Sequence, residues 1–341
     1  MQQLTCTGPG KLAFHDVPAP TLQGDGEALV RPLAVARCDI DLALLSGTFP
    51  LRGAFAVGHE CVAEIVALGD AVRGLAVGQR VVVSFQLSCG RCGACSAGYS
   101  ARCEAYPVLS DYGMQPLSGV DYGGMLSDLV RVPHAAAMLR PIPDRLDPVA
   151  LASVSDNVLD GFRAVAPHLA ACPGARVLVV AHGLPSVPLY AVQAAVALGA
   201  SRVDFASSDE TLLAHAARLG ARPVATDFEK RGERYPIVVE GGLSEAGLRY
   251  AVASTAPDGV LQSVSFYPQG ALPLPLGKLY TLGFRLAIGR CSAVSELPRV
   301  LPLIESGALH PEAVTTRVVD WSDAPSAWLE PATKLVVRRA R

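Results

Sequence analysis

The chain has 341 residues, of which 50% are hydrophobic and 18% charged, and its net charge is −2. This length is sufficient for two domains with separate cores. The near-zero net charge and the lack of a basic run argue against nucleic acid or an anionic membrane as a partner.

No stretch of about 20 apolar residues is present, so no membrane-spanning helix is predicted. Residues 1–4 lack the basic and apolar regions of a secretory signal. The sequence therefore predicts a cytoplasmic protein, whose nine cysteines point to metal ligands and reduced thiols rather than disulfides.

The first part of the chain, to about residue 135, is predicted to form short strands separated by Gly and Pro. The clearest candidates are residues 28–35, 61–68, 80–83 and 126–132. Strands and helices do not alternate in this part, which favours an all-β, barrel-like domain.

Four residues with metal-binding side chains are associated with this part: Cys38, His59, Glu60 and, farther along, Asp156. A thiolate, an imidazole and carboxylates form a workable zinc ligand set. Their spacing alone is weak evidence, because a single histidine is more often structural and a single glutamate more often a solvated charge. The residues by themselves leave both interpretations open.

The strongest motif is the run of Cys89, Cys92, Cys95 and Cys103, with the spacing C-x2-C-x2-C-x7-C. Four thiolates form a closed tetrahedral site that is typical of structural zinc. An iron–sulfur cluster is the nearest alternative, but ferredoxin runs usually place proline after the last cysteine, and here Glu104 follows. A disulfide cluster is the remaining alternative, and no secretory signal supports it.

From about residue 157 the pattern changes to alternating strands and helices. Apolar strands are predicted at 176–180, 202–205, 236–240 and 259–264, with helices at 189–198 and after Ser208, which is predicted to be a helix cap. This alternation predicts an α/β domain with a doubly wound parallel sheet and a nucleotide crevice.

The turn after the first of these strands is an irregular dinucleotide motif. Of the three glycines in the motif G-x-G-x-x-G, only Gly183 is clearly present. The turn is also about two residues longer than the plain motif. Backbone N–H groups at the following helix start can still bind pyrophosphate. We therefore predict cofactor contacts at His182, Gly183, Ser186 and Val187, although a nucleotide fold without a nucleotide is the alternative.

The end of the second strand usually carries an acidic residue for the NAD ribose. Here Ser207 and Ser208 occupy this region, and no arginine follows directly, as an NADP site would prefer. Both NAD(H) and NADP(H) remain possible cofactors, with a slight preference for NADP(H).

The triplet Gly58-His59-Glu60, the four-cysteine run, Cys38 and the nucleotide-type second part together resemble the medium-chain dehydrogenase/reductase superfamily, in its zinc-dependent alcohol dehydrogenase family. The resemblance extends from about residue 20 to about residue 337. It implies a GroES-like β-barrel catalytic domain over 1–156, completed by 290–341, and a Rossmann nucleotide-binding domain over 157–289. The tail is expected to form a helix at 295–309, a strand at 314–319 and a short helix at 323–329.

The resemblance also implies two zinc ions per chain. The cysteine run would hold the structural ion, and Cys38, His59, Glu60 and Asp156 would hold the catalytic one, because Asp156 lies five residues before the pair Gly161-Phe162. Relatives of this kind suggest a homodimer or homotetramer that acts on a small-molecule substrate.

Three further positions are interpreted through the resemblance. Lys334 stands where the family often has a base that faces the pyrophosphate, although an ordinary surface lysine is equally consistent. Ile40 replaces the usual Ser or Thr that takes the alcohol proton. Asp160, directly before Gly161, would face the nicotinamide and transfer that proton, unless it only stabilises a helix N-terminus.

The leading hypothesis is therefore a zinc- and nicotinamide-dependent oxidoreductase of alcohols or carbonyls. A reductase of C=N or activated C=C bonds is the second, since it would not need an alcohol proton relay. A non-catalytic relative with structural zinc only is the third.

Overall fold

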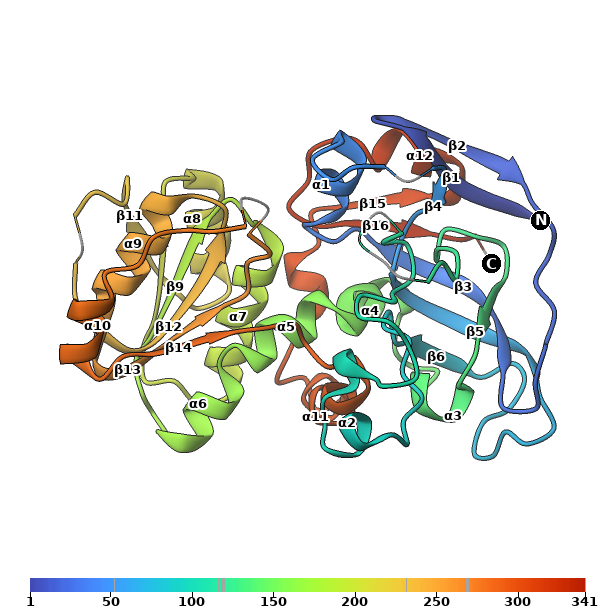
Figure 1. Cartoon of the computed structure of the whole chain (residues 1–341), viewed down its shortest axis with the longest axis horizontal. Helices are drawn as coiled ribbons and strands as arrows, with labels where there is room; N and C mark the ends of the chain where they lie inside the picture. Colours follow the sequence, from blue (N-terminus) through green and yellow to red (C-terminus); the bar gives the residue numbers. More distant parts are fainter. Residues whose placement is uncertain (52, 116, 118–119, 231, 268–269, 341) are drawn as a thin grey trace. The chain divides into compact units, whose positions relative to one another are not determined.

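The computed structural model describes residues 1–51, 53–115, 117, 120–230, 232–267 and 270–340. The chain forms two compact units (Figure 1). Unit 1 comprises Met1–Leu159, Cys291–Pro302 and Thr315–Arg341, and unit 2 comprises Asp160–Arg290 and Leu303–Val314.

Residues 303–314 were expected in the first domain, but they group with unit 2. Side chains of unit 2 bind this segment, since Gln193 Nε2 donates to the carbonyl of His310 at 2.9 Å and His215 Nε2 lies 2.7 Å from the carbonyl of Ala313. The first break in the chain lies after Leu159, three residues beyond the expected boundary at 156.

Unit 1 is built on two sheets (Figure 1). The smaller has the order β2 (Lys11–Asp16), β1 (Gln2–Gly8), β4 (Phe55–Ala56). The larger has the order β15 (Arg317–Asp320), β16 (Leu335–Arg338), β3 (Ala28–Ala36), β5 (Glu60–Leu68), β6 (Arg80–Val83), β8 (Leu139–Pro141), and β7 (Val130–Val132) also pairs with β3.

The predicted strands at 28–35, 61–68 and 80–83 are confirmed within a residue at either end. The strand predicted at 126–132 is shortened to β7 because Leu126 is bonded elsewhere: its carbonyl accepts from Leu4 N and its N–H donates to Val57. The short helices of this unit are α1 (Asp41–Ser46), α2 (Gly93–Ser96), η1 (Ser100–Arg102), α3 (Ala135–Met138), α4 (Pro148–Leu151), η2 (Ala152–Ser155), η4 (Trp321–Asp323) and α12 (Ala324–Ala327).

Unit 2 contains a six-stranded parallel sheet in the order β11 (Arg222–Ala225), β10 (Val203–Ser207), β9 (Val177–His182), β12 (Tyr235–Gly242), β13 (Thr255–Ser263), β14 (Arg285–Ile288). Counted along the chain this order is 3-2-1-4-5-6, which is the doubly wound arrangement of dinucleotide-binding domains. The strand order reverses between β9 and β12, and ligands bind at the carboxyl ends of the strands at such a point.

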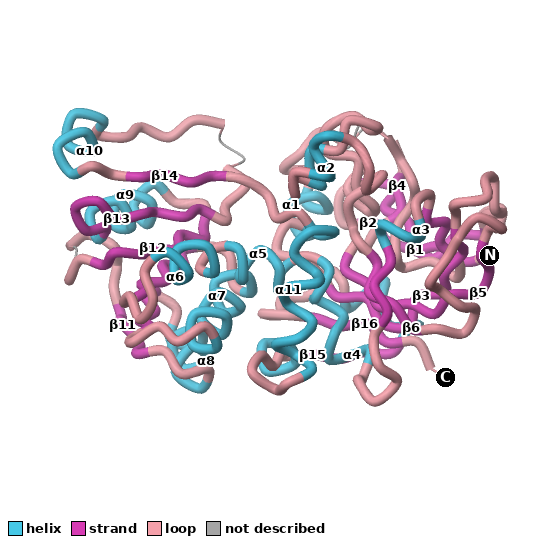
Figure 2. The backbone as a smooth tube through the Cα atoms, turned by 90° about the horizontal axis from the view of Figure 1, so that it is seen from below, coloured by secondary structure: helices cyan, strands magenta, loops and turns pink. Residues whose placement is uncertain are grey.

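The helices of this part of the chain (Figure 2) are α5 (Asn157–Arg163), α6 (Ala166–Ala171), α7 (Ser186–Ala197), α8 (Glu210–Arg218), α9 (Glu245–Ser254), α10 (Leu276–Leu282), η3 (Pro311–Val314) and α11 (Ala293–Glu305). The last of these continues from unit 1 into unit 2. Asp209, not Ser208, caps α8, because its carboxylate accepts from the N–H groups of both Thr211 and Leu212.

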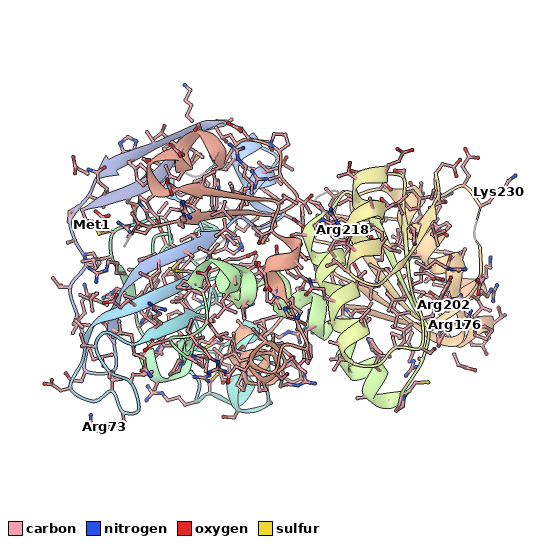
Figure 3. The ribbon with its side chains drawn as sticks, turned by 180° about the vertical axis from the view of Figure 1, so that it is seen from behind. Met1, Arg73, Arg176, Arg202, Arg218 and Lys230 are labelled. Carbon is pink, nitrogen blue, oxygen red and sulfur yellow. The ribbon has the colours of Figure 1, made fainter. Side chains whose placement is uncertain are left out.

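At the amino ends of these strands, Asp204 is fully buried and accepts two hydrogen bonds from Arg222, at 2.9 and 2.8 Å. Arg176 and Arg202, labelled in Figure 3, both bind Glu233 nearby. In the part of the chain that the structure describes, no helix is long and apolar enough to cross a membrane.

Candidate metal centres and cofactor turn

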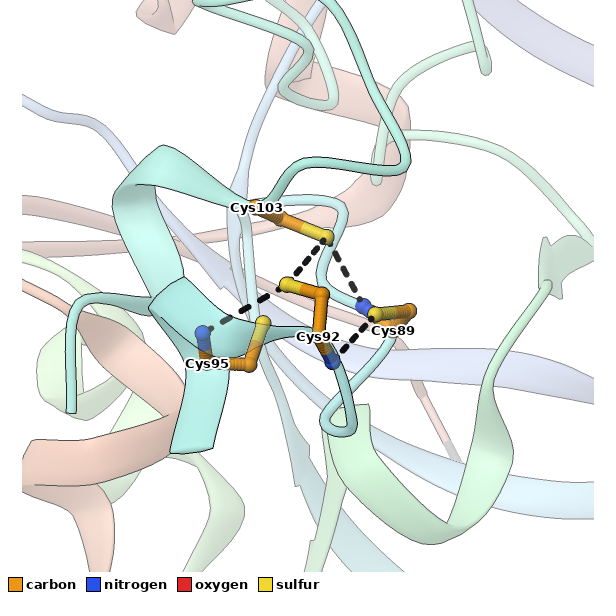
Figure 4. A group of neighbouring side chains, drawn as sticks. All are labelled: Cys89, Cys92, Cys95 and Cys103. Atoms are coloured by element: carbon orange, nitrogen blue, oxygen red, sulfur yellow. Dashed lines mark hydrogen bonds between the residues drawn. The ribbon is translucent and has the colours of Figure 1, made fainter. Parts of the chain in front are cut away.

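The four cysteines of the predicted zinc lobe converge (Figure 4). The sulfur atoms of Cys89, Cys92, Cys95 and Cys103 all lie within 4.8 Å of one another, and those of Cys92 and Cys103 are 4.0 Å apart. Zn–S bonds in a tetrahedral site place the sulfurs about 3.8 Å apart. The donor set and its spacing therefore fit a closed zinc site, and all four cysteines are free of disulfides.

Backbone N–H groups point at these sulfurs. Cys92 Sγ accepts from Cys95 N at 3.5 Å and from Glu104 N at 3.4 Å, and these bonds lower the pKa of its thiol to about 6. Cys103 Sγ accepts from Cys89 N at 3.2 Å. Cys92 thus favours the thiolate, the form that binds metal, whereas burial raises the pKa of the Cys95 and Cys103 thiols.

The second predicted metal set is assembled by strand register in unit 1. Ala36 of β3 pairs with Val336 of β16 on one side and with Glu60 of β5 on the other. The residues that extend these three strands, Lys334, Cys38 and His59, therefore reach the same edge of the sheet. The preceding Gly58 has a φ of +88°, and a Cβ there would lie 3.1 Å from Val35, which explains the glycine.

Cys38, His59, Glu60 and Asp156 offer ligand atoms within 4.8 Å of one another. All four are buried, with exposed fractions of 7%, 0%, 0% and 8%. Asp156 directly follows η2, and its carboxylate lies 3.2 Å from His59 Nε2. The structure therefore brings together the whole catalytic-zinc set expected from the sequence.

The charges around this set fit a cation. Asp41, Glu60 and Asp156 are all buried here, and burial raises the pKa of the Glu60 carboxyl to about 8 despite the nearby Lys334. Burial and the neighbouring Asp156 also raise the pKa of the Cys38 thiol. Several buried anionic groups are costly unless a positive charge compensates them, and Zn²⁺ would supply that charge.

Two side chains orient the ligands. Asp41 accepts from Cys38 N at 2.8 Å, and its other oxygen lies 3.4 Å from His59 Nδ1, which leaves Nε2 directed at the metal set. Burial lowers the pKa of His59, but Asp41 and Asp156 more than offset this and raise it. Asn157 Nδ2 donates to Cys38 Sγ at 3.0 Å and to Asp156 at 3.3 Å.

The interpretation of Lys334 as a surface or pyrophosphate-facing residue is corrected. Lys334 is fully buried, and its Nζ lies 2.8 and 2.7 Å from the two carboxylate oxygens of Glu60 and 2.5 Å from Asn157 Oδ1. The pairing of β16 with β3 carries it inward, and a buried ammonium requires such anionic and carbonyl partners.

The predicted cofactor turn follows β9 in unit 2. Gly183 adopts a φ of +141°, and a Cβ there would lie 3.3 Å from Leu243 N, so the turn needs a glycine. Ser186 and Val187 form the first residues of the 12-residue helix α7 rather than the middle of the turn. A glycine turn that leads into a helix N-terminus fits a bound pyrophosphate.

The other predicted cofactor contacts have defined surroundings. His182 directs its side chain at Glu240, with Nε2 2.6 Å from Oε1. Ser207 ends β10, is buried, and accepts from Asp209 N at 3.1 Å, whereas Ser208 is exposed. Asp204 lies inside the strand, as expected, and so no carboxylate stands at the end of β10 itself.

Residues 24–144 match the alcohol dehydrogenase GroES-like domain family. The chain is 31% identical over 228 residues to a medium chain reductase/dehydrogenase, ucsI, of Acremonium sp, covering 66% of this chain and 75% of that protein. The chain is a medium-chain dehydrogenase/reductase. It belongs to the zinc-type alcohol dehydrogenase family within that superfamily.

Two further relatives match nearly the whole chain. A probable zinc-binding alcohol dehydrogenase of Mycobacterium tuberculosis is 26% identical over 334 residues, which cover 96% of this chain and 84% of that protein. The structure of alcohol dehydrogenase TADH from Thermus sp. ATN1 is 27% identical, covers 100% of both chains and superposes with a TM-score of 0.91. The GroES-like and Rossmann-type fold expected from the sequence is thus confirmed.

Within this dehydrogenase, the surroundings of Asp160 differ from those expected. The residue lies in the first turn of α5, and its carboxylate accepts from Arg163 Nε at 2.5 Å. Both side chains are largely buried, with exposed fractions of 14% and 13%. The paired cation favours the ionised carboxylate, whereas the relay hypothesis needs a carboxylate that can take up a proton.

Sequence reasoning missed two contacts of the dehydrogenase's buried metal set. Cys291 stands outside both predicted ligand sets, yet its Sγ lies 3.5 Å from Asp156 Oδ1. Asn157 carried no signal beyond its place next to Asp156. Neither contact follows from spacing, because Cys291 lies 135 positions from its partner.

Proposed function

We propose that this family member transfers a hydride between a nicotinamide cofactor and an alcohol or carbonyl substrate at the buried set of Cys38, His59, Glu60 and Asp156. The observation that carries the proposal is the convergence of these four ligands in unit 1. A parallel sheet with a glycine turn at its switch point, in unit 2, supplies the second requirement, a dinucleotide-binding fold.

Each residue of the metal set has a role in this proposal. Glu60 is paired with Lys334 through both oxygens, so of the four converging residues Cys38, His59 and Asp156 would bind the zinc ion directly. Asp41 and Asn157 hold these ligands in place. When bound there, zinc acts as a Lewis acid that polarises the substrate oxygen.

The cofactor is proposed to be NAD(H) or NADP(H), held by the turn at Gly183 and the start of α7. The nicotinamide carries the hydride chemistry, and the protein positions it. Ser207 and Ser208 present no carboxylate to repel a 2′-phosphate, which supports NADP(H) as the preferred form. The second zinc ion is proposed to occupy the cysteine lobe in a structural role.

Ile40 supports a second candidate function. It precedes α1 directly and offers no hydroxyl to carry an alcohol proton. A reductase of C=N or activated C=C bonds would not need that hydroxyl. Initial rates on matched alcohol, ketone, imine and enone panels distinguish the two functions.

Zinc analysis combined with cofactor titration tests the proposal. We expect two zinc ions per chain, one of which a chelator removes more readily, and saturable binding of NADH or NADPH. Cys38→Ala should retain one zinc and lose turnover. One zinc per chain that is unchanged in Cys38→Ala, together with no cofactor-dependent turnover, would indicate a non-catalytic relative.

A further inference from the structure

Unit 2 contains a buried carboxylate that the proposed chemistry does not use. Glu240 is fully buried in β12, where it pairs in register with Val180 of β9 and Ser263 of β13. It therefore lies two residues before the end of β12, beside the point at which the strand order reverses.

Four donors converge on this carboxylate. His182 Nε2 lies 2.6 Å from Oε1, Ser265 Oγ donates to Oε1 at 3.0 Å, and Ser263 Oγ and Tyr267 OH lie 2.7 and 2.8 Å from Oε2. An ionised carboxylate is an acceptor only and can take all of these bonds. Both oxygens of the Glu240 carboxylate therefore have hydrogen-bond donors.

The partners of Glu240 are neutral. His182 Nδ1 accepts from Ser244 N at 3.1 Å, so this nitrogen carries no proton and the imidazole is the neutral Nε2–H form. In the described part of the chain, no lysine or arginine forms an ion pair with Glu240. The cluster of His182, Glu240, Ser263, Ser265 and Tyr267, here called the Glu240 network, thus carries one negative charge.

The backbone is shaped to hold this network. A Cβ on Gly242 or Gly247 would lie 2.4 or 2.1 Å from the ring of His182, so these two glycines make room for the imidazole. Tyr267 has a φ of +42°, a left-handed conformation that is strained in a non-glycine residue. Such strain persists where the surroundings require it, and the bond from Tyr267 OH to Glu240 is one contact that this conformation accompanies.

Its place in the sheet relates the network to one half of the cofactor. In a doubly wound domain the first three strands hold one mononucleotide and the last three hold the other. The adenosine ribose binds at the end of the second strand, β10. The nicotinamide half is therefore expected to bind at the ends of β12, β13 and β14. Glu240 belongs to β12, Ser263 ends β13, and Ser265 lies two residues beyond that end.

We propose that the Glu240 network is an electrostatic element of the nicotinamide site that favours the oxidised cofactor. The nicotinamide ring is positively charged in NAD(P)⁺ and neutral in NAD(P)H, so a fixed negative charge nearby stabilises the oxidised form selectively. The bound cofactor is then a stronger reductant than the free one. This inference rests on the proposed cofactor binding and assigns Glu240 a positioning and electrostatic role rather than a catalytic one.

The test is the ratio of dissociation constants for the oxidised and reduced cofactor, measured by calorimetry and by NAD(P)H fluorescence. Glu240→Gln removes the charge and retains the shape. The ratio Kd(oxidised)/Kd(reduced) should rise by on the order of 10-fold, because the attraction between the anion and the positively charged nicotinamide ring is lost. A tenfold change corresponds to about 30 mV in the two-electron potential of the bound cofactor.

Matched variants separate charge from packing. Tyr267→Phe removes one hydrogen-bond donor and retains the anion. The affinities for the oxidised and reduced cofactor should therefore change together, and the ratio Kd(oxidised)/Kd(reduced) should stay unchanged. Asp204→Asn removes a buried carboxylate that Arg222 already neutralises, and the ratio should again hold. Ser265→Lys places a cation beside the retained carboxylate and should shift the ratio in the same direction as Glu240→Gln.

An unchanged ratio in both Glu240→Gln and Ser265→Lys, with both cofactor forms bound, overturns this inference alone. A wild-type protein that binds neither form overturns the proposed function and the inference together. A parallel loss of affinity for both forms in Glu240→Gln shows that the network has only a structural role.

Discussion

At the scale of single residues, the pairing of Lys334 with Glu60 makes the sharpest prediction. Both side chains have 0% exposure, so Lys334→Met leaves a buried carboxylate without its cation. Removing one partner of a buried pair costs about 3–5 kcal/mol. We expect a loss of this size in the free energy of unfolding of unit 1, measured by denaturant titration of zinc-loaded protein.

Arg338, in the strand β16 that follows Lys334, provides the control. Its pair with Asp320 is exposed by 57% and 60%, so Arg338→Met should lower stability far less than Lys334→Met does. The double variant Glu60→Gln with Lys334→Met should recover part of the loss, because it leaves no buried charge. Equal stability of Lys334→Met and wild type would contradict the buried pairing.

At the scale of elements, the lobe around α2 and η1 depends on its metal. Cys92→Ser removes one of four thiolates and should lower zinc content by about one ion per chain. Because structural zinc binding is coupled to folding, the variant should unfold at a clearly lower temperature than wild type. Thermal unfolding and metal analysis measure both effects.

Cys172→Ser is the matched control for this lobe, since Cys172 is exposed and belongs to neither metal set. It should retain both zinc ions and the wild-type unfolding temperature. A Cys92→Ser protein as thermostable as this control would refute a structural zinc site.

Helix α5 makes a second prediction at this scale. Asp160→Asn removes the ion pair between two largely buried side chains and should cost about 3 kcal/mol of stability. Turnover and its pH profile should stay within about twofold of wild type, because the paired carboxylate is not available as a proton carrier. A large fall in turnover with zinc content and cofactor affinity retained would restore Asp160 to the proton path.

At the scale of the whole molecule, we propose that the chain assembles as a homodimer or homotetramer. In the described sheet of unit 2, β14 is an edge strand, and Leu286 and Ile288 on it are 36% and 58% exposed. An edge of this kind favours pairing with another strand. Light scattering should give a dimer or tetramer, and Ile288→Lys should shift it toward monomer.

Val77→Lys tests whether any added charge has this effect, because Val77 is also exposed, by 63%, but lies in a loop of unit 1. It should leave the assembly unchanged. A monomeric wild type would contradict the proposed assembly.

The sequence by itself determined the features that depend on local pattern. The spacing of Cys89, Cys92, Cys95 and Cys103 predicted a compact thiolate site, because four ligands within fifteen residues can converge through one tight turn. The alternation of strand-like and helix-like stretches after residue 157 predicted the parallel sheet. The two kinds of stretch can be distinguished in the sequence because the hydrophobic periodicity of a strand differs from that of a helix. Family resemblance, rather than spacing, brought Cys38 and Asp156 into one ligand set.

Only the tertiary structure decided which partner each buried charge has. Lys334 faces Glu60, which lies 274 positions away in the sequence, because β16 pairs with β3. Likewise, the bond between His182 and Glu240 depends on β9 and β12 lying side by side. Such pairings are set by strand register and by the need to satisfy buried charges, and neither leaves a periodic signal along the chain.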